Sequence, residues 1–122
     1  MTCRGLSNPK VGHEMQKIGQ YVSLEKILSE ALHQASSGKG AERHARDGEP
    51  FDQQPICEIG RRLGVGGPLF QAAKKIYESE RLPGERGIAE LLGAINYIAA
   101  AIIVWREKII ALPDKDDPVS HQ

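Results

Sequence analysis

Basic side chains gather in the middle of the chain, where they could bind the phosphate groups of a small ligand. Arginine can form bidentate hydrogen bonds with phosphate, and lysine adds a point charge. Aromatic rings could stack on a base, and an amide could form hydrogen bonds with it. The phosphate candidates are Arg43, Arg46, Arg61, Arg62, Lys74 and Arg106, and the base candidates are Phe70, Asn96 and Tyr97. These residue types predict a site for a small anionic ligand such as a nucleotide.

A glycine-rich turn lies among these candidates. Residues 64–67 read GVGG, and Pro68 follows. If a helix begins here, its free backbone N–H groups and the positive end of its dipole would attract an anion. The alternative is a compact connection between two helices that binds nothing. The Gly-Lys-Ser/Thr pattern of phosphate-loop hydrolases is absent, which excludes that class of enzyme.

The stretch 56–73 resembles the helix-turn-helix of DNA-binding proteins. Gly60 takes the small position at which two helices cross, and Gly64 takes the turn four residues later. The expected core positions are Ile59, Leu63 and Val65, followed by Phe70, Ala73 and Ile76 on the second helix. Gln71 could then read adenine, while Lys74 could contact DNA phosphates. A helix-turn-helix transcriptional regulator is therefore an alternative function.

The sequence lacks the patterns that catalysis and metal binding require. Glu78 and Glu80 are two residues apart, so they do not share a helix face as paired magnesium ligands would. Cys3 and Cys57 form no Cys-x-x-Cys pair, and Cys57 has the character of a small buried hydrophobic residue. We expect no enzyme activity, no cofactor and no bound metal.

Helical signals run through most of the chain, and no segment predicts a strand. A first apolar stripe ends near Val22, and a second begins at Leu24, so Ser23 either caps a new helix or lies in a stutter of one helix. Residues 36–55 are polar and predict a loop. Pro55 should open a short helix that ends at Leu63, with Gly64 as a left-handed stop. Pro68 should open the next helix, which ends before residues 82–84.

The clearest signal is a long helix over residues 85–112. Its apolar residues recur at steps of three and four, which is an unbroken heptad pattern over about 40 Å of helix. The positions are Ile88, Leu91, Ile95, Ile98, Ile102, Trp105, Ile109 and Leu112. One short chain cannot easily cover so long a face, so we expect this helix to form an interface between copies of the protein. Asn96 lies within the apolar run, where it either fixes the helix register or contacts a ligand.

Composition favours one soluble domain over residues 1–122, with a flexible tail at residues 113–122. The 122 residues carry 16 Lys plus Arg and 16 Asp plus Glu, so the net charge is zero. A neutral chain speaks against DNA binding and permits self-association. The longest apolar run, residues 94–105, is shorter than a membrane span, and no apolar signal segment begins the chain. We therefore expect a cytoplasmic protein without a membrane partner.

The chain as a whole resembles phage-encoded sponge proteins that sequester immune nucleotide signals, which include the Thoeris anti-defence family. The likeness lies in a basic loop, ERHARDGEPFDQQPI, that leads into a self-associating helix, ELLGAINYIAAAII. It implies an oligomer that binds a cyclic or ADP-ribose-type nucleotide without cleaving it. The sequence thus predicts an all-α protein of four or five helices that sequesters such a ligand. The alternatives are the DNA-binding regulator and an inhibitor that docks on another protein.

Overall fold

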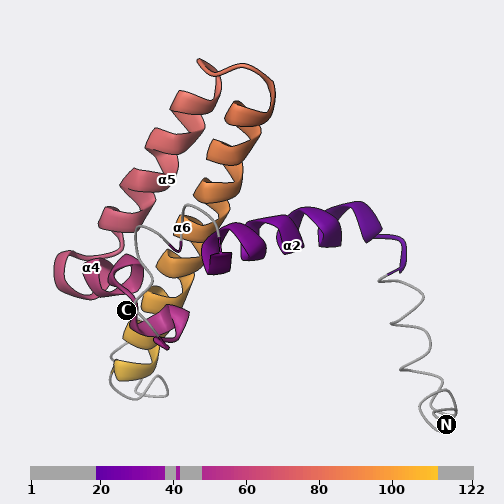
Figure 1. Cartoon of the computed structure of the whole chain (residues 1–122). Coiled ribbons are helices and arrows are strands. Elements are labelled where there is room, and N and C mark those ends of the chain that lie inside the picture. Colours follow the sequence, from indigo (N-terminus) through magenta and orange to yellow (C-terminus); the bar gives the residue numbers. More distant parts are fainter. Residues whose placement is uncertain (1–18, 38–40, 42–47, 113–122) are drawn as a thin grey trace, which may run out of the picture.

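The computed structural model describes residues 19–37, 41 and 48–112, and most of these residues are helical (Figure 1). The α-helices are α2 (Val22–Ser37), α4 (Pro55–Leu63), α5 (Gly66–Ser79) and α6 (Gly84–Ala111), and a 3-10 turn, η2, covers Phe51–Gln53. No strand occurs among the described residues. The all-α prediction is therefore confirmed. The part of the first apolar stripe before residue 19, most of the predicted polar loop and the predicted tail at 113–122 lie outside the described residues.

Helices α5 and α6 form an antiparallel hairpin, and they share the most extensive contact between any two described elements (Figure 1). The two helices approach closely because the buried residues between them are small, including Ala72, Ala94 and Ala101. At the closed end of the hairpin, Gly87 faces backbone: a Cβ there would lie 2.7 Å from the carbonyl oxygen of Ser79. The predicted helix at 85–112 is thus confirmed to within one residue at each end.

Helix α4 crosses the C-terminal half of α6 and forms the core with it. Ile56, Cys57, Ala100 and Val104 are its buried apolar residues. Gly60 permits the crossing, because a Cβ at this position would lie 3.2 Å from a methyl group of Val104. Pro55 opens the helix at its first turn, as predicted.

Two predicted boundaries differ from the structure. Gly64 ends α4 with φ 95° and ψ 163°, so its φ is positive as expected, but its ψ is extended rather than left-handed helical. Helix α5 begins at Gly66, two residues before Pro68, which places the proline inside the first turn. A proline is tolerated there because the N–H groups of a first turn have no partner within the helix.

Helix α2 is attached to the rest of the described chain by its C-terminal half only. It meets the middle of α6 at a steep angle, and its N-terminal half projects away from the hairpin (Figure 1). Ala31 is buried, whereas Gln34 and Ala35 are half-buried. Gln20 and Tyr21 form a turn before α2 begins at Val22, so Ser23 lies within the first turn and is not the cap.

Candidate functional site

A cleft lined by both apolar and charged residues lies between α2 and the N-terminal half of α6. Its cavity has a volume of about 710 Å³, which is within the range of about 300–1,000 Å³ typical of small-molecule sites. Helix α2 forms one wall, α6 forms the other, and α5 contributes one lysine. The polar and aromatic lining comprises Lys26, Ser29, Glu30, His33, Gln34, Phe51, Gln54, Lys75, Arg86, Glu90, Asn96 and Tyr97. We call this cavity the α2/α6 cleft.

The cleft carries more positive than negative charge. Lys26, Lys75 and Arg86 face two carboxylates, Glu30 and Glu90. The ammonium group of Lys75 pairs with Glu90 Oε1 at 3.3 Å and lies 5.9 Å from the ring centre of Tyr97. That side chain is 13% exposed, so Lys75 is fixed by its neighbours. Lys26 and Arg86, both on exposed positions, are therefore the cations best placed for a ligand.

Gly93 forms the floor of the cleft. A Cβ at this position would lie 3.0 Å from Lys75 Cδ and 3.2 Å from Gln34 Nε2. The missing side chain lets Lys75 and Gln34 lie close over the surface of α6. A glycine inside a helix lowers helix stability by about 1 kcal/mol relative to alanine. The close packing of Lys75 and Gln34 explains why glycine occupies this position.

Asn96 fastens α2 to α6 at the back of the cleft. Its Nδ2 donates a hydrogen bond of 2.9 Å to the backbone oxygen of the buried residue Ala31. The structure therefore supports the register role that the sequence left open for this residue. Tyr97 is half-buried beside it and also lines the cleft. These are the two of the nine predicted site residues that the structure brings together in this cavity.

A second cavity, of about 770 Å³, lies on the other side of α2. Its lining is mostly apolar and includes Leu28, Leu32, Ile95, Ala99 and Ile103. Because few charged groups face it, this groove is suited to an apolar side chain or helix rather than to an anion.

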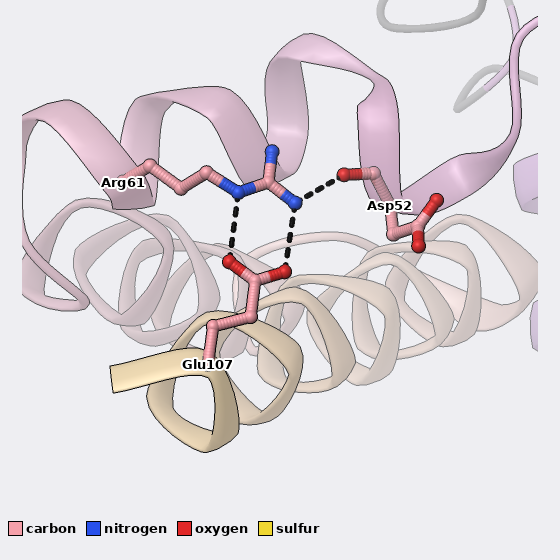
Figure 2. A network of polar contacts seen from close by, with 3 residues as sticks. All are labelled: Asp52, Arg61 and Glu107. Carbon is pink, nitrogen blue, oxygen red and sulfur yellow. Dashed lines mark hydrogen bonds and ion pairs between the residues drawn. The ribbon is translucent and has the colours of Figure 1, made fainter. Parts of the chain in front are cut away.

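Arg61, a predicted phosphate-binding residue, links helices by an ion pair and hydrogen bonds within the protein. Its guanidinium group donates to both carboxylate oxygens of Glu107, at 2.8 and 2.9 Å, and also to the backbone oxygen of Asp52 (Figure 2). This pairing raises the pKa of Arg61 and lowers the pKa of Glu107. Arg61 joins α4 and η2 to α6, and it lines neither cavity.

The remaining predicted site residues lie apart from the cleft. Arg62, Phe70, Lys74 and Arg106 are exposed on three different helices and line neither cavity. Arg43 and Arg46 lie outside the described residues. The structure thus does not gather the described phosphate candidates at one place. Sequence reasoning missed Lys26, His33 and Arg86, and the one signal that could have indicated the cleft is Gly93 within an otherwise apolar helix.

Helices α4 and α5 do not pack as the predicted helix-turn-helix requires. Phe70 and Ile76 are 64% and 45% exposed, whereas Pro68 and Ala72 on the other face are buried. Ile59 and Leu63 are exposed as well. The predicted core face of α5 is therefore wrong, because α5 packs mainly along α6 and turns its large apolar residues outward.

The glycine-rich turn also forms ordinary helix contacts. The N–H of Gly67 donates to the backbone oxygen of Gly64 at 3.1 Å, and the N–H of Leu69 donates to Val65 at 3.0 Å. Pro68 has no N–H to offer. The first turn of α5 thus has few free donors, which supports the compact helix connection over an anion site.

The heptad residues of α6 face outward. We define the α6 seam as Ile88, Leu91, Ile95, Ile98, Ile102, Trp105 and Ile109. Ile95 is half-buried, and the other six are between 40% and 53% exposed. Soluble monomers rarely expose so large a continuous apolar surface. By length and composition α6 could also cross a membrane, a property that it shares with core helices of soluble proteins.

Comparison with protein-family models, curated proteins and solved structures finds no match to this chain. No group of three or more His, Cys, Asp or Glu side chains could hold a metal ion within the described part of the chain. What the geometry offers is a cleft with excess positive charge on an all-α scaffold that leaves one apolar face open.

Proposed function

We propose that the protein binds a small anionic ligand in the α2/α6 cleft without transforming it, and that it does so as a self-associated helical protein. The observation that carries this proposal is the cleft itself. Its volume suits a nucleotide-sized molecule. Lys26 and Arg86 stand on opposite walls, so a ligand with two separated anionic groups could contact both.

The ligand class we favour is a nucleotide. The Tyr97 ring supplies an aromatic surface, while Gln34 offers an amide group to a base or ribose. Arg86 offers a planar fork that matches the oxygens of a phosphate. A cyclic or ADP-ribose-type nucleotide would satisfy these groups, and we propose that the cleft sequesters this ligand rather than hydrolysing it.

Self-association belongs to the same proposal, and its support is the open α6 seam. Burial of a large aliphatic side chain is worth about 1.5–3 kcal/mol, so a second copy that covers this seam would stabilise the assembly. Replacement of Ile98 by glutamate should convert an oligomer to monomer in light scattering. Leu63→Glu is the matched control, because Leu63 is 78% exposed and lies on α4, away from the seam.

Binding is tested by a nucleotide panel in thermal-shift and native mass spectrometry experiments. A ligand at 100 times its dissociation constant stabilises the fold by about 2.7 kcal/mol, which is a shift of several degrees. Arg86→Ala and Lys26→Ala should each abolish most of that shift. Arg81→Ala is the control, since Arg81 is an exposed arginine in the α5–α6 turn that does not line the cleft.

Two results would count against the proposal. Equal loss of binding in the control would mean that charge alone, and not the cleft, attracts the ligand. Retention of full affinity in both cleft variants would place the ligand elsewhere. We do not propose DNA binding, because α4 and α5 lack the packing that a recognition helix requires.

A further inference from the structure

The N-terminal half of α2 has no support within the described part of the chain. Every residue from 22 to 30 is exposed, and the first buried residue of the helix is Ala31. Isolated helices shorter than about 12–15 residues are marginal in water. We call residues 22–28 the arm, and Figure 1 shows it projecting away from the α5–α6 hairpin. A helix in this position needs a surface to pack against.

The arm carries the first residues of an apolar stripe whose later residues pack against α6. Leu24, Leu28, Ala31 and Ala35 recur at helical spacing and share one face. The small residues Ala31 and Ala35 lie on α6, where close approach is needed. The larger residues Leu24 and Leu28, nearer the start of the helix, are 52% and 49% exposed. The apolar face of α2 is therefore longer than the part of it that packs against α6.

The arm and the α6 seam together expose enough area for a stable interface. Leu24, Ile27 and Leu28 of the arm, and Tyr21 directly before it, are each about half exposed, as are the six open residues of the seam. At about half of a full side-chain surface apiece, they offer roughly 800–900 Å², the area that each partner of a standard interface buries. The seam alone would fall well short of that area.

We propose that a second copy of this chain occupies the apolar surface formed by the arm and the α6 seam, so that each copy grips the other with its α2. This inference rests on the proposed self-association and adds the arm to its interface. A two-fold arrangement uses the same patch on both copies, and the side chains that form this patch, such as Leu24, Leu28 and Ile98, are apolar.

A membrane fits this surface less well than a second copy does. Helix α5 lies along α6 and carries Lys74 and Lys75 in its second half and Glu78 in its last turn. If α6 crossed a bilayer in this fold, those charges would enter the hydrocarbon region, where each costs several kcal/mol. The arm, which carries Glu25 and Lys26 between its apolar residues, has the mixed character of a protein interface.

The arm also bears part of the candidate site. Lys26 lies on the arm and lines the α2/α6 cleft, whereas Arg86 lies on α6. A second copy that fixes the arm would therefore fix one cationic wall of the cleft. The site would be complete only in the associated protein.

The test measures self-association of the full chain by sedimentation velocity over a wide concentration range, for the wild type, Leu24→Glu and Val22→Glu. Leu24→Glu should raise the dissociation constant of the assembly about 100-fold or more, because a two-fold interface loses the leucine twice. Val22→Glu should leave it unchanged, since Val22 is 59% exposed but lies on the opposite face of the same helix. Hydrogen exchange should show that residues 22–28 become protected as the protein concentration rises.

The outcomes separate the two proposals. If Ile98→Glu dissociates the protein while Leu24→Glu does not, the arm is outside the interface and this inference fails, although self-association stands. If the wild type is monomeric at all concentrations, both fail. If the wild type associates only with phosphatidylcholine vesicles, a bilayer covers the surface and the inference is overturned. Circular dichroism of Leu24→Glu guards against loss of the fold as the cause.

Discussion

Gly87 determines how closely α5 and α6 approach at the closed end of their hairpin. A Cβ at this position would meet the backbone oxygens of Ser79 and Leu82 at 2.7 and 3.0 Å, and backbone atoms cannot move aside cheaply. We predict that Gly87→Ala destabilises the protein by about 1–3 kcal/mol, despite the better helix propensity of alanine.

Gly66 provides the matched control for that prediction. It also lies in a helix, but a Cβ there would have no neighbour within 4 Å. Gly66→Ala should leave the free energy of unfolding unchanged or raise it by about 0.4–1 kcal/mol. Urea denaturation of both variants checks the pair, and equal stabilities would mean that the hairpin relaxes around the added methyl group.

Cys57 makes stability depend on alkaline pH. Its side chain is fully buried in the core with Ile56, Ala100 and Val104. Burial raises the pKa of the Cys57 thiol to about 11, while the positive charge of Arg61 opposes part of that rise. Because the folded pKa lies above the usual value of 9.0, the unfolded chain loses this proton first as the pH rises.

We therefore predict that the wild type loses stability between about pH 9 and 11 more steeply than Cys57→Ala does. The contribution is fully present below pH 9 and is lost as the pH approaches the folded pKa. Melting temperatures of both proteins over this range provide the measurement. Since lysines and tyrosines titrate in both, parallel curves would show that the thiol contributes nothing.

At the scale of elements, Arg61 and Glu107 hold the C-terminal end of α6 against α4 and η2. Both side chains are partly exposed, at 28% and 43%, so water screens their attraction. We predict a coupling energy of about 0.5–1 kcal/mol in a double-mutant cycle of Arg61→Ala and Glu107→Ala. The coupling should vanish in acid, because protonation of Glu107 below its usual pKa removes the ion pair.

The attachment of α2 to α6 depends on Asn96. Asn96→Ala removes its hydrogen bond to Ala31 and leaves a backbone oxygen with one partner fewer, which costs about 1 kcal/mol. We predict faster hydrogen exchange over residues 22–37 in this variant, with little change in α4 or α5. Uniformly faster exchange would mean that Asn96 supports the whole fold and not the attachment of one helix.

Local sequence patterns were sufficient to predict the boundaries of most described helices. Pro55 marked the start of α4, Gly60 marked its crossing point, and the heptad spacing marked α6 almost to its ends. The same rules did not show which face of α5 is covered. An apolar stripe on a helix indicates that another surface should cover it. It does not indicate whether that surface belongs to the same chain or to another copy. For this reason Phe70 and Ile76 were wrongly assigned to the core.

The candidate cleft was beyond local rules because its walls come from distant segments. Lys26 and Arg86 line the same cavity only because α2 crosses α6 near Asn96, and no pattern of spacing encodes such a crossing. The predicted phosphate residues were chosen by type and neighbourhood in the sequence. Arg61 shows the weakness of that choice, because its guanidinium group forms an ion pair with Glu107 and is not free to bind a phosphate.

At the scale of the whole molecule, folding and association should be linked. If a second copy stabilises the arm and the α6 seam, the melting temperature should rise with protein concentration, because only the folded chain can associate. We predict an increase over a hundredfold concentration range for the wild type and none for Ile98→Glu. Calorimetry at several concentrations measures both, and a constant melting temperature for the wild type would contradict the prediction.

The two walls of the cleft are α2 and α6, which touch over a small area. Ala31, Ala35 and Asn96 form most of this contact. A molecule that bridges Lys26 and Arg86 would therefore tighten that junction, and by thermodynamic reciprocity a tighter junction would hold the molecule better by the same factor. Abundant protein would then capture its ligand at lower ligand levels than scarce protein, so that the amount of protein made sets the threshold for uptake.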